Sequence, residues 1–398
     1  MKKLLLASAA GMALTGALTG GAIAQEVKFG VILGFTGPIE SLTPHMADSA
    51  ELAFKEISDS GLFLDGQTIT PVRADSTCVD SSAATAAAER LITSDGIVGI
   101  MGPDCSGVTM AVLQNVAMAN GVPLISPSAT SPGFTTTESN GLFFRTAPSD
   151  ARQGAVMADV LMERGITSVA VTYTNNDYGK GLSDAFAESY AAAGGSITIN
   201  APHEDGKGDY SAEVGALASA GGDLLVVFGY SDQGGAGIMI NAIESGAFDT
   251  FAMGDGMYSD ALLETIGSDL NGTIGTVPWS EGEGTEAFAA FATENGVNAE
   301  SSYTRESYDA AALLALAAQA AGEATSAGIA ANILNVANAP GEPIMPGELA
   351  KGLEILAAGG EIDYVGATNV ELIGPGEAAG TYREYIVEDG AFTTVSFR

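Results

Sequence analysis

Short apolar runs alternate with helix-forming stretches along the first third of the chain. The apolar runs, which we expect to form strands, are VKFGVILGF (27–35), TITPVRADS (68–76), IVGIMGP (97–103) and VPLIS (122–126). The stretches between them predict helices at 48–58, 82–95 and 106–121. Strands that are apolar throughout and separated by helices are buried on both faces. The pattern therefore predicts an α/β fold with a parallel sheet covered by helices on both sides.

The pattern stops at FFRTAPSD (143–150) and then starts again. Four more apolar runs predict strands, with helical stretches between them: SVAVTYTN (168–175), SITINAP (196–202), DLLVVFGY (223–230) and TFAMGD (250–255). Two consecutive doubly wound units predict two parallel-sheet lobes joined by a hinge, with a cleft between them. We expect one lobe to comprise 25–147 with 276–378, and the other to comprise 148–275 with 379–398.

The last third of the sequence predicts further helices at 308–321 and 347–356, and a closing hairpin around Glu388-Asp389-Gly390. The Ala/Leu-rich run 310–321 is too short to span a bilayer and predicts a buried helix. We expect the lobes to open and close about a hinge near Pro148 and Gly275.

The N-terminus is typical of an export signal. Lys2 and Lys3 precede an apolar stretch at 4–18, and Ala22-Ile23-Ala24 fits the small-x-small cleavage pattern. We expect residues 1–24 to be a signal peptide that is removed, so that the mature protein begins at Gln25 and acts in the periplasm. The alternative is an uncleaved anchor, because 4–24 carries no charge and has nearly the length of a membrane span.

Charge excludes two classes of partner. The chain has 49 acidic and 15 basic residues, with a net charge of −34, so nucleic acid and anionic membranes would be repelled. The acidic residues predict a well-solvated surface and do not identify a ligand. We expect a monomer.

Motifs for catalysis and for cofactors are missing. The sequence has no G-x-G-x-x-G, P-loop or G-x-S-x-G pattern, and its two histidines, His45 and His203, lack metal-ligand spacing. We therefore expect no enzyme activity, no metal and no cofactor. Cys78 and Cys105 are the only cysteines, and an isolated pair in an exported protein favours a disulfide.

Two polar loops follow predicted strands. GPDCSG (102–107) ends one strand and opens a helix, and ISPSATSP (125–132) follows the next strand. Ligands of open parallel sheets bind at the carboxyl ends of the strands, and a helix start with hydroxyl groups suits a carboxylate. Ser106 has a simpler alternative role as a helix N-cap. Arg145 is expected to form a structural ion pair near the lobe crossover.

These loops belong to a longer series of motifs that occur in order. Together, the motifs resemble the periplasmic leucine/isoleucine/valine-binding protein family, the receptors of ABC transporters; they are GFTGPIE (34–40), DSTCVDSSAA (75–84), GPDCSG (102–107), ISPSATSP (125–132), FFRTAPSD (143–150), NDYGKGL (176–182) and MGDGMYSD (253–260). The resemblance implies a type I periplasmic binding protein fold. Its implied partners are an amino acid ligand and a membrane permease.

The resemblance also implies roles for individual residues. It pairs Cys78 with Cys105 in a disulfide. It places the ligand's carboxylate at Ser106 and Thr130, with backbone groups near Asp104 and Ser128. The ligand's ammonium would meet the Ser128 carbonyl and Asp255. Tyr178 and Tyr230 would line the second lobe's face of the cleft.

Two departures from the family bear on the ligand. A bulky aromatic that covers aliphatic ligands in the family is replaced around Ser41-Leu42-Thr43, and Asp104 stands where the family has an apolar residue. A carboxylate is favourable beside a polar or cationic group, so we expect an amino acid with a polar or basic side chain. The alternatives are a same-fold receptor for amides, urea, aromatic acids or other small carboxylates, and a soluble sensory binding protein.

Overall fold

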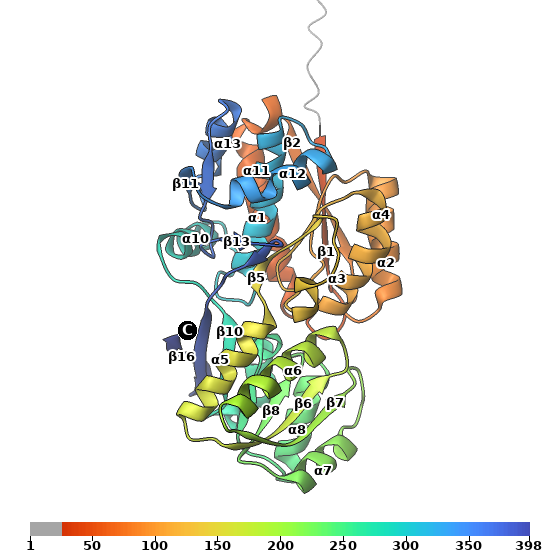
Figure 1. Ribbon diagram of the computed structural model, residues 1–398, viewed down its shortest axis with the longest axis vertical. Helices are drawn as coiled ribbons and strands as arrows, with labels where there is room; N and C mark the ends of the chain where they lie inside the picture. The colour runs from red at the N-terminus through yellow and green to blue at the C-terminus, as the bar shows by residue number, and fades with distance from the viewer. Residues whose placement is uncertain (1–25) are drawn as a thin grey trace, which may run out of the picture.

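The computed structural model describes residues 26–398 and contains two seven-stranded sheets, each the centre of one lobe. The predicted signal peptide lies outside the described residues. Figure 1 shows the two lobes stacked along the long axis of the molecule. The first sheet has the strand order β13-β14-β5-β4-β3-β1-β2, and the second has the order β16-β15-β10-β9-β8-β6-β7. The prediction of two α/β lobes is therefore confirmed.

The strands are β1 (Glu26–Leu33), β2 (Thr68–Asp75), β3 (Ile100–Met101), β4 (Leu124–Ser126), β5 (Phe143–Pro148), β6 (Ser168–Thr174), β7 (Ser196–His203), β8 (Leu224–Phe228), β9 (Phe251–Met253), β10 (Ile274–Pro278), β11 (Glu342–Ile344), β12 (Ile362–Tyr364), β13 (Leu372–Ile373), β14 (Glu377–Ala378), β15 (Tyr382–Glu388) and β16 (Ala391–Phe397). The helices are α1 (Thr43–Ser60), α2 (Ser81–Arg90), α3 (Ser106–Val112), α4 (Met118–Asn120), α5 (Asp150–Glu163), α6 (Asp177–Ala192), α7 (Ser211–Ala220), α8 (Gly234–Ser245), α9 (Asp260–Ile266), α10 (Glu283–Glu294), α11 (Thr304–Ala321), α12 (Ser326–Ala337) and α13 (Leu349–Ala357).

Both sheets are parallel in the middle and mixed at one edge. β1 pairs in parallel with β2 and β3, and β6 pairs in parallel with β7 and β8. The C-terminal segment adds the antiparallel pairs β13–β14, β10–β15 and β15–β16. The predicted hairpin is confirmed, because Glu388 pairs with Ala391 and the turn residues Asp389 and Gly390 have φ values of 52° and 76°.

The sequence did not predict β5, β10 or the short strands β11 to β14, and of these β5 and β10 are inner strands of the two sheets. The FFRTAPSD segment, where the pattern stops, contains the fully buried strand β5, and the boundary predicted at Gly275 falls inside β10. β5 escapes recognition because Arg145 and Pro148 interrupt its apolar run, and β10 is short. The chain passes between the sheets after β5, after β10 and after β14. The lobe boundaries and the hinge stay predictions.

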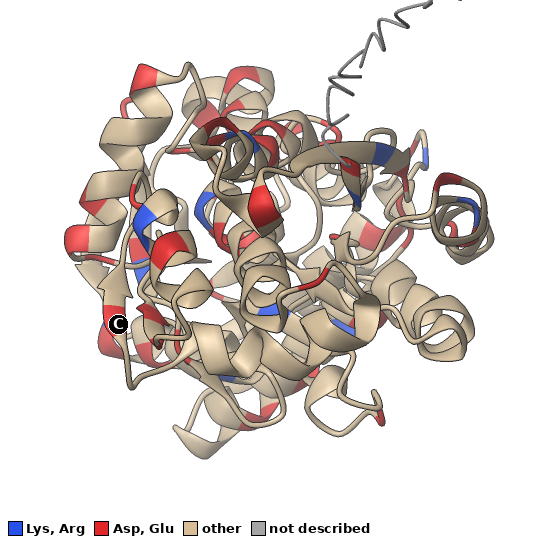
Figure 2. Ribbon diagram, turned by 90° about the horizontal axis from the view of Figure 1, so that it is seen from above, with Lys and Arg blue, Asp and Glu red and all other residues tan. Residues whose placement is uncertain are grey.

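α11 is buried along most of its length, as the Ala/Leu-rich run predicts. It packs against α1 and α12 in the first lobe, where small alanine side chains allow helices to approach closely. None of the helices described in 26–398 combines the length and apolar character needed to cross a membrane. Figure 2 shows Asp and Glu spread over many helices and loops, with few Lys and Arg between them.

Glu306, in the first turn of α11, provides a prediction about pH. Its side chain is buried, and burial raises its pKa from 4.5 to about 7. The folded chain therefore binds more protons than the unfolded chain between these values, and stability falls as the pH rises through this range. We expect Glu306→Gln to raise the free energy of unfolding at about pH 8 by up to about 3 kcal/mol. Near pH 4 the variant and the wild type should be equally stable.

Urea unfolding at both pH values measures this difference. Glu294→Gln, an exposed change at the end of α10, serves as the control. A Glu306→Gln protein that is less stable than the wild type at about pH 8 would show that ionised Glu306 is stabilising.

Candidate ligand-binding site

A narrow cavity between the lobes brings together most of the predicted site residues. Its volume is about 20 Å³, and its lining comprises Ile39, Leu42, Asp104, Cys105, Ser106, Ser128, Tyr178, Tyr230, Asp255, Gly256 and Tyr303. Wider hollows lie elsewhere, including one of about 160 Å³ beside Ser41 and His45. We place the site in the inner cavity because buried polar groups from both lobes converge there.

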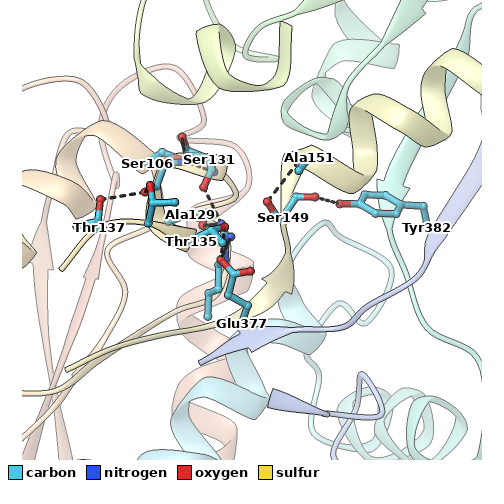
Figure 3. Close-up of polar contacts among 12 residues, drawn as sticks. Ser106, Ala129, Ser131, Thr135, Thr137, Ser149, Ala151, Glu377 and Tyr382 are labelled. Atoms are coloured by element: carbon cyan, nitrogen blue, oxygen red, sulfur yellow. Dashed lines mark hydrogen bonds and ion pairs between the residues drawn. The ribbon is translucent and has the colours of Figure 1, made fainter. Parts of the chain in front are cut away.

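The first-lobe side of the cavity begins where β3 leads into α3. Gly102 has φ 105°, and a Cβ at this position would lie 2.1 Å from the carbonyl oxygen of Ile32, so only glycine allows the loop to pass so close to β1. Cys105 takes the N-cap position without a side-chain cap, and Ser106 is the first residue of α3. The Ser106 hydroxyl accepts a hydrogen bond of 3.1 Å from the backbone N–H of Ser131 (Figure 3). Ser106 therefore connects the two predicted loops and does not cap the helix.

The loop after β4 is held against the first loop by its own serines. The Ser128 hydroxyl donates to the carbonyl oxygen of Asp104 at 3.2 Å, and Ser126 donates to the carbonyl oxygen of Pro103. Thr130 is fully buried, and its hydroxyl lies next to the carboxylate of Asp150. The structure thus brings Ser106 and Ser128 to the cavity wall, whereas Thr130 is not among the residues that line the cavity. Their contacts with a ligand stay predictions.

The carboxylate of Asp104 is hydrogen-bonded to groups of its own lobe. Its carboxylate accepts hydrogen bonds from the N–H of Gly34 at 2.6 Å, the hydroxyl of Ser76 at 3.0 Å and the N–H of Cys105 at 2.9 Å. Burial raises the pKa of Asp104, and these hydrogen bonds oppose the rise. Asp104 therefore ties together the loops that follow β1, β2 and β3, and most of its acceptor capacity is used there.

The second lobe contributes a tyrosine pair. Asn176 caps α6 by accepting a hydrogen bond of 3.0 Å from the N–H of Gly179, which fixes the first turn that carries Tyr178. The Tyr178 and Tyr230 rings stack with centroids 5.3 Å apart. Asn176 also donates to the Tyr230 hydroxyl at 3.2 Å. Both tyrosines are buried and present their rings to the cavity.

Asp255 lies at the end of β9 and is held by two tyrosines. The Tyr178 hydroxyl donates to Asp255 Oδ1 at 2.9 Å and accepts from the N–H of Gly256 at 3.1 Å. The Tyr303 hydroxyl donates to Asp255 Oδ2. Burial raises the pKa of Asp255, and the two tyrosines oppose this effect. Tyr303 was not predicted from the sequence, because the family resemblance is weak after Gly275.

Asp150 is a second residue that sequence reasoning missed. It opens α5 directly after the crossover from β5, is fully buried, and its N–H donates to the Thr130 carbonyl at 2.9 Å. Burial raises its pKa well above 3.8, and the charge of Asp255 raises it further. The only sequence signal was an acidic residue at the end of the FFRTAPSD motif.

Arg145 forms the expected structural ion pair. Its guanidinium pairs with Glu377 of β14 and donates to the carbonyl oxygens of Ala129 at 3.1 Å and Ser131 at 2.9 Å. Arg145 is fully buried, so these contacts are shielded from water. The pair therefore holds the second polar loop, which contains Ala129 and Ser131, in place.

The lobes also touch at the edge of the cavity. The Asp232 carboxylate accepts hydrogen bonds from the N–H of Ser41 at 2.7 Å and from its hydroxyl at 2.8 Å. The N–H of Asp232 donates to the carbonyl oxygen of Pro38 at 3.1 Å. These contacts hold the loop 34–42 of the first lobe against the second lobe.

The predicted disulfide is present. Cys78 and Cys105 are bonded, with a separation of 27 residues along the chain. The bond joins the loop after β2 to the residue that precedes Ser106. It therefore restrains the loop that carries a predicted ligand residue.

The sequence is similar to that of known solute-binding proteins. Residues 26–350 match a family model described as periplasmic binding protein. The Leu/Ile/Val-binding protein homolog 1 of Brucella abortus (strain 2308) is 31% identical over 320 residues, which cover 78% of this chain and 83% of the relative. The chemotactic signal transduction system substrate-binding protein BasB of Halobacterium salinarum is 28% identical over 368 residues, which cover 87% of this chain and 84% of the relative.

Solved structures share the fold at lower identity. A leucine binding protein of Thermotoga maritima gives a TM-score of 0.77 at 23% identity and covers 93% of this chain and 98% of its own. An ABC transporter solute binding protein of R. palustris, in complex with benzoate, gives a TM-score of 0.73 at 18% identity, with 94% and 96% coverage. With the family match over 26–350, the two-lobed fold and the order of the motifs, this chain belongs to the family of periplasmic binding proteins that includes the Leu/Ile/Val-binding proteins.

Proposed function

We propose that this protein is the periplasmic solute-binding component of an ABC importer and captures an amino acid between its lobes. The observation that supports this most directly is the inner cavity, where serine hydroxyls of the first lobe face a buried carboxylate of the second. Ser106 and Ser128 suit a ligand carboxylate, and Asp255 suits a ligand ammonium. Ile39 and Leu42 add an apolar wall for the ligand's side chain.

The identity of the side chain needs a separate argument. The hypothesis of a polar or basic side chain depends on Asp104, but its carboxylate already accepts three hydrogen bonds from its own lobe. Asp104 therefore gives little support to a cationic side chain. Leu42, in the region where the family's covering aromatic is replaced, is apolar and smaller. These residues favour a ligand with an uncharged side chain.

Closure of the two lobes explains how a permease would recognise the ligand-bound protein. Contacts such as those of Asp232 with Ser41 form only when the lobes are together. A ligand that binds residues of both lobes has a higher affinity for the closed state than for the open state. It shifts the equilibrium toward the closed state by as much as these two affinities differ. The closed form is then the shape that a membrane permease would recognise.

A sensory role is the second candidate. The relative from Halobacterium salinarum is described as part of a chemotactic signal transduction system, and it matches along 87% of this chain. In that role the closed form would be recognised by a membrane receptor, and the ligand site would be unchanged.

A thermal-shift screen with the twenty L-amino acids, urea and benzoate tests the proposed ligand class. A ligand at about 1,000 times its Kd should stabilise the folded protein by about 4 kcal/mol, so an amino acid should raise the melting temperature by several degrees. Ser106→Ala should weaken that amino acid about tenfold, since one charge-assisted hydrogen bond is lost. Ser82→Ala, at the exposed start of α2, is the matched control. Binding of benzoate or urea alone would contradict the proposed ligand class.

A further inference from the structure

A cluster of hydrogen bonds joins the two lobes outside the inner cavity. The Asp232 carboxylate, which follows β8 in the second lobe, accepts from the N–H of Ser41 at 2.7 Å and from its hydroxyl at 2.8 Å. The Ser41 and Ser259 hydroxyls lie 3.1 Å apart, and the N–H of Asp232 donates to the carbonyl oxygen of Pro38 at 3.1 Å. None of these four residues lines the inner cavity. We call the contacts of Ser41 with Asp232 and Ser259 the interlobe latch.

The first-lobe half of the latch is held in place by its own lobe. The Thr36 hydroxyl donates to the Asp75 carboxylate at 2.7 Å, which ties the loop that carries Ser41 to the end of β2. Gly37 has φ 119°, and a Cβ at this position would lie 2.4 Å from the carbonyl oxygen of Thr77, so only glycine lets the loop pack so closely. The Ser41 donors are therefore preorganised, and little conformational entropy is lost when they meet the second lobe.

The second-lobe half of the latch is connected to the loop that carries Asp255. The N–H of Ser231 donates to the carbonyl oxygen of Gly256 at 3.0 Å, and the Ser231 hydroxyl donates to the Asp232 carboxylate at 3.1 Å. Ser259, the N-cap of α9, lies on the same segment of the chain as Asp255. The predicted ligand residue of the second lobe and the latch are thus parts of one connected set of loops.

The latch stabilises the closed arrangement without any atom of a ligand. A hydrogen bond to a carboxylate is stronger than one between neutral groups. Asp232 and Ser41 are both half-buried, so water replaces part of these bonds when the lobes separate, and the net effect is smaller than the strength of each bond. Because the ligand is not involved, the latch contributes the same free energy to closure whichever ligand is bound.

We propose that Ser41 and Asp232 act as positioning residues that set the affinity of the protein for all its ligands without contacting any of them. The inference rests on the proposed function, because it assumes that ligands bind between lobes that open and close. The apparent affinity is the affinity of the closed arrangement reduced by the fraction of protein that adopts it. A weaker latch lowers this fraction, so every ligand loses affinity by the same factor. Since the latch must break before a ligand leaves, the loss appears mainly in the dissociation rate.

The test compares several ligands on the same latch variants. Isothermal titration calorimetry measures the Kd of L-leucine, L-valine, L-glutamine and L-arginine, and stopped-flow displacement measures their dissociation rates. We expect Asp232→Ala to raise the Kd of each amino acid that binds by the same factor of about 5 to 20, because two hydrogen bonds to a carboxylate are lost. Ser41→Ala keeps its N–H and should raise each Kd by about threefold. Both variants keep the backbone bond to Pro38.

Small-angle X-ray scattering of the ligand-free proteins tests the latch directly. Asp232→Ala should have a larger radius of gyration than the wild type, because fewer contacts hold the lobes together. A larger radius with a smaller change in Kd would also support the inference, since a wild type that is mostly closed without ligand has less affinity to lose. Asp269→Ala, an exposed change elsewhere in the second lobe, is the matched control and should change neither quantity.

Two results would overturn the inference. One is a Kd within about twofold of the wild type for Asp232→Ala together with an unchanged radius of gyration. The other is a set of losses that differ by more than about threefold between amino acids, which would mean that Asp232 contacts the ligand itself. If Asp232→Ala does not fold, the same comparisons with Ser41→Ala decide the question.

Failure of the proposed function is recognised separately. A wild-type protein that binds none of the amino acids would overturn the proposed function. Scattering by the ligand-free wild type and variants would still show whether the latch holds the lobes together, because that measurement needs no ligand.

Discussion

Replacing Arg145 by methionine is expected to lower the free energy of unfolding by about 3–5 kcal/mol. The guanidinium is fully buried, pairs with Glu377 and donates to the carbonyl oxygens of Ala129 and Ser131. Methionine fills a similar volume but leaves a buried carboxylate and two carbonyl oxygens without these donors. Breaking a buried ion pair on one side is costly because the remaining charge is uncompensated. Urea unfolding followed by circular dichroism measures the loss.

The same change should also weaken binding, because Arg145 supports the loop that carries Ser128 and Thr130. Arg152→Met, at an exposed position of α5, removes a guanidinium of the same kind and should be close to neutral. Glu377→Gln should cost less than Arg145→Met, since the carbonyl contacts survive and Thr135 still has an oxygen to donate to. A loss below about 1 kcal/mol for Arg145→Met would show that the loop is held by other contacts.

Removing the disulfide should have the next largest effect on stability. The bond between Cys78 and Cys105 closes a loop with a separation of 27 residues. In the chain-entropy model a loop of this length stabilises the folded state by about 3–4 kcal/mol. The double variant Cys78→Ala with Cys105→Ala should lose this amount in urea unfolding without reductant.

A reductant distinguishes the covalent bond from side-chain packing. Dithiothreitol should destabilise the wild type by nearly the same amount and leave the double variant unchanged. The variant should also bind its amino acid more weakly, because Cys105 precedes Ser106 and restrains the start of α3. Equal stability of wild type and variant would mean that the denatured chain is not restrained by the bond.

The two-lobed fold could be predicted because its signals are local. Apolar runs such as those that became β1, β6 and β8 are buried on both faces, and their composition alone indicates a parallel sheet. β5 was missed because it contains Arg145, a charge that a buried strand accepts only when a partner is available. That partner, Glu377, is 232 residues away along the chain. No local pattern contains this information.

The residues of the candidate site also fall into two groups: those that local sequence patterns predict and those that only the tertiary structure reveals. Ser106, Ser128, Tyr178 and Asp255 lie at strand ends or helix starts, positions that can be recognised along the sequence, and the structure gathers all four around one cavity. Tyr303 reaches Asp255 from the start of α11, 48 residues further along. Asp150 looks like an ordinary residue of a helix's first turn until the structure shows it fully buried and close to Asp255.

The sequence by itself determined the α/β architecture, the two lobes, the acidic character and the loops where a ligand would bind. These properties follow from periodicity, composition and the start and stop signals of single elements. Only the tertiary structure decided which buried carboxylates are already paired, because their donors come from distant segments. The Asp104 carboxylate accepts three hydrogen bonds from groups of its own lobe, whereas Asp150 is buried beside the charge of Asp255. Hydrogen bonding of a buried charge is a property of its surroundings in space, and the chain does not encode it locally.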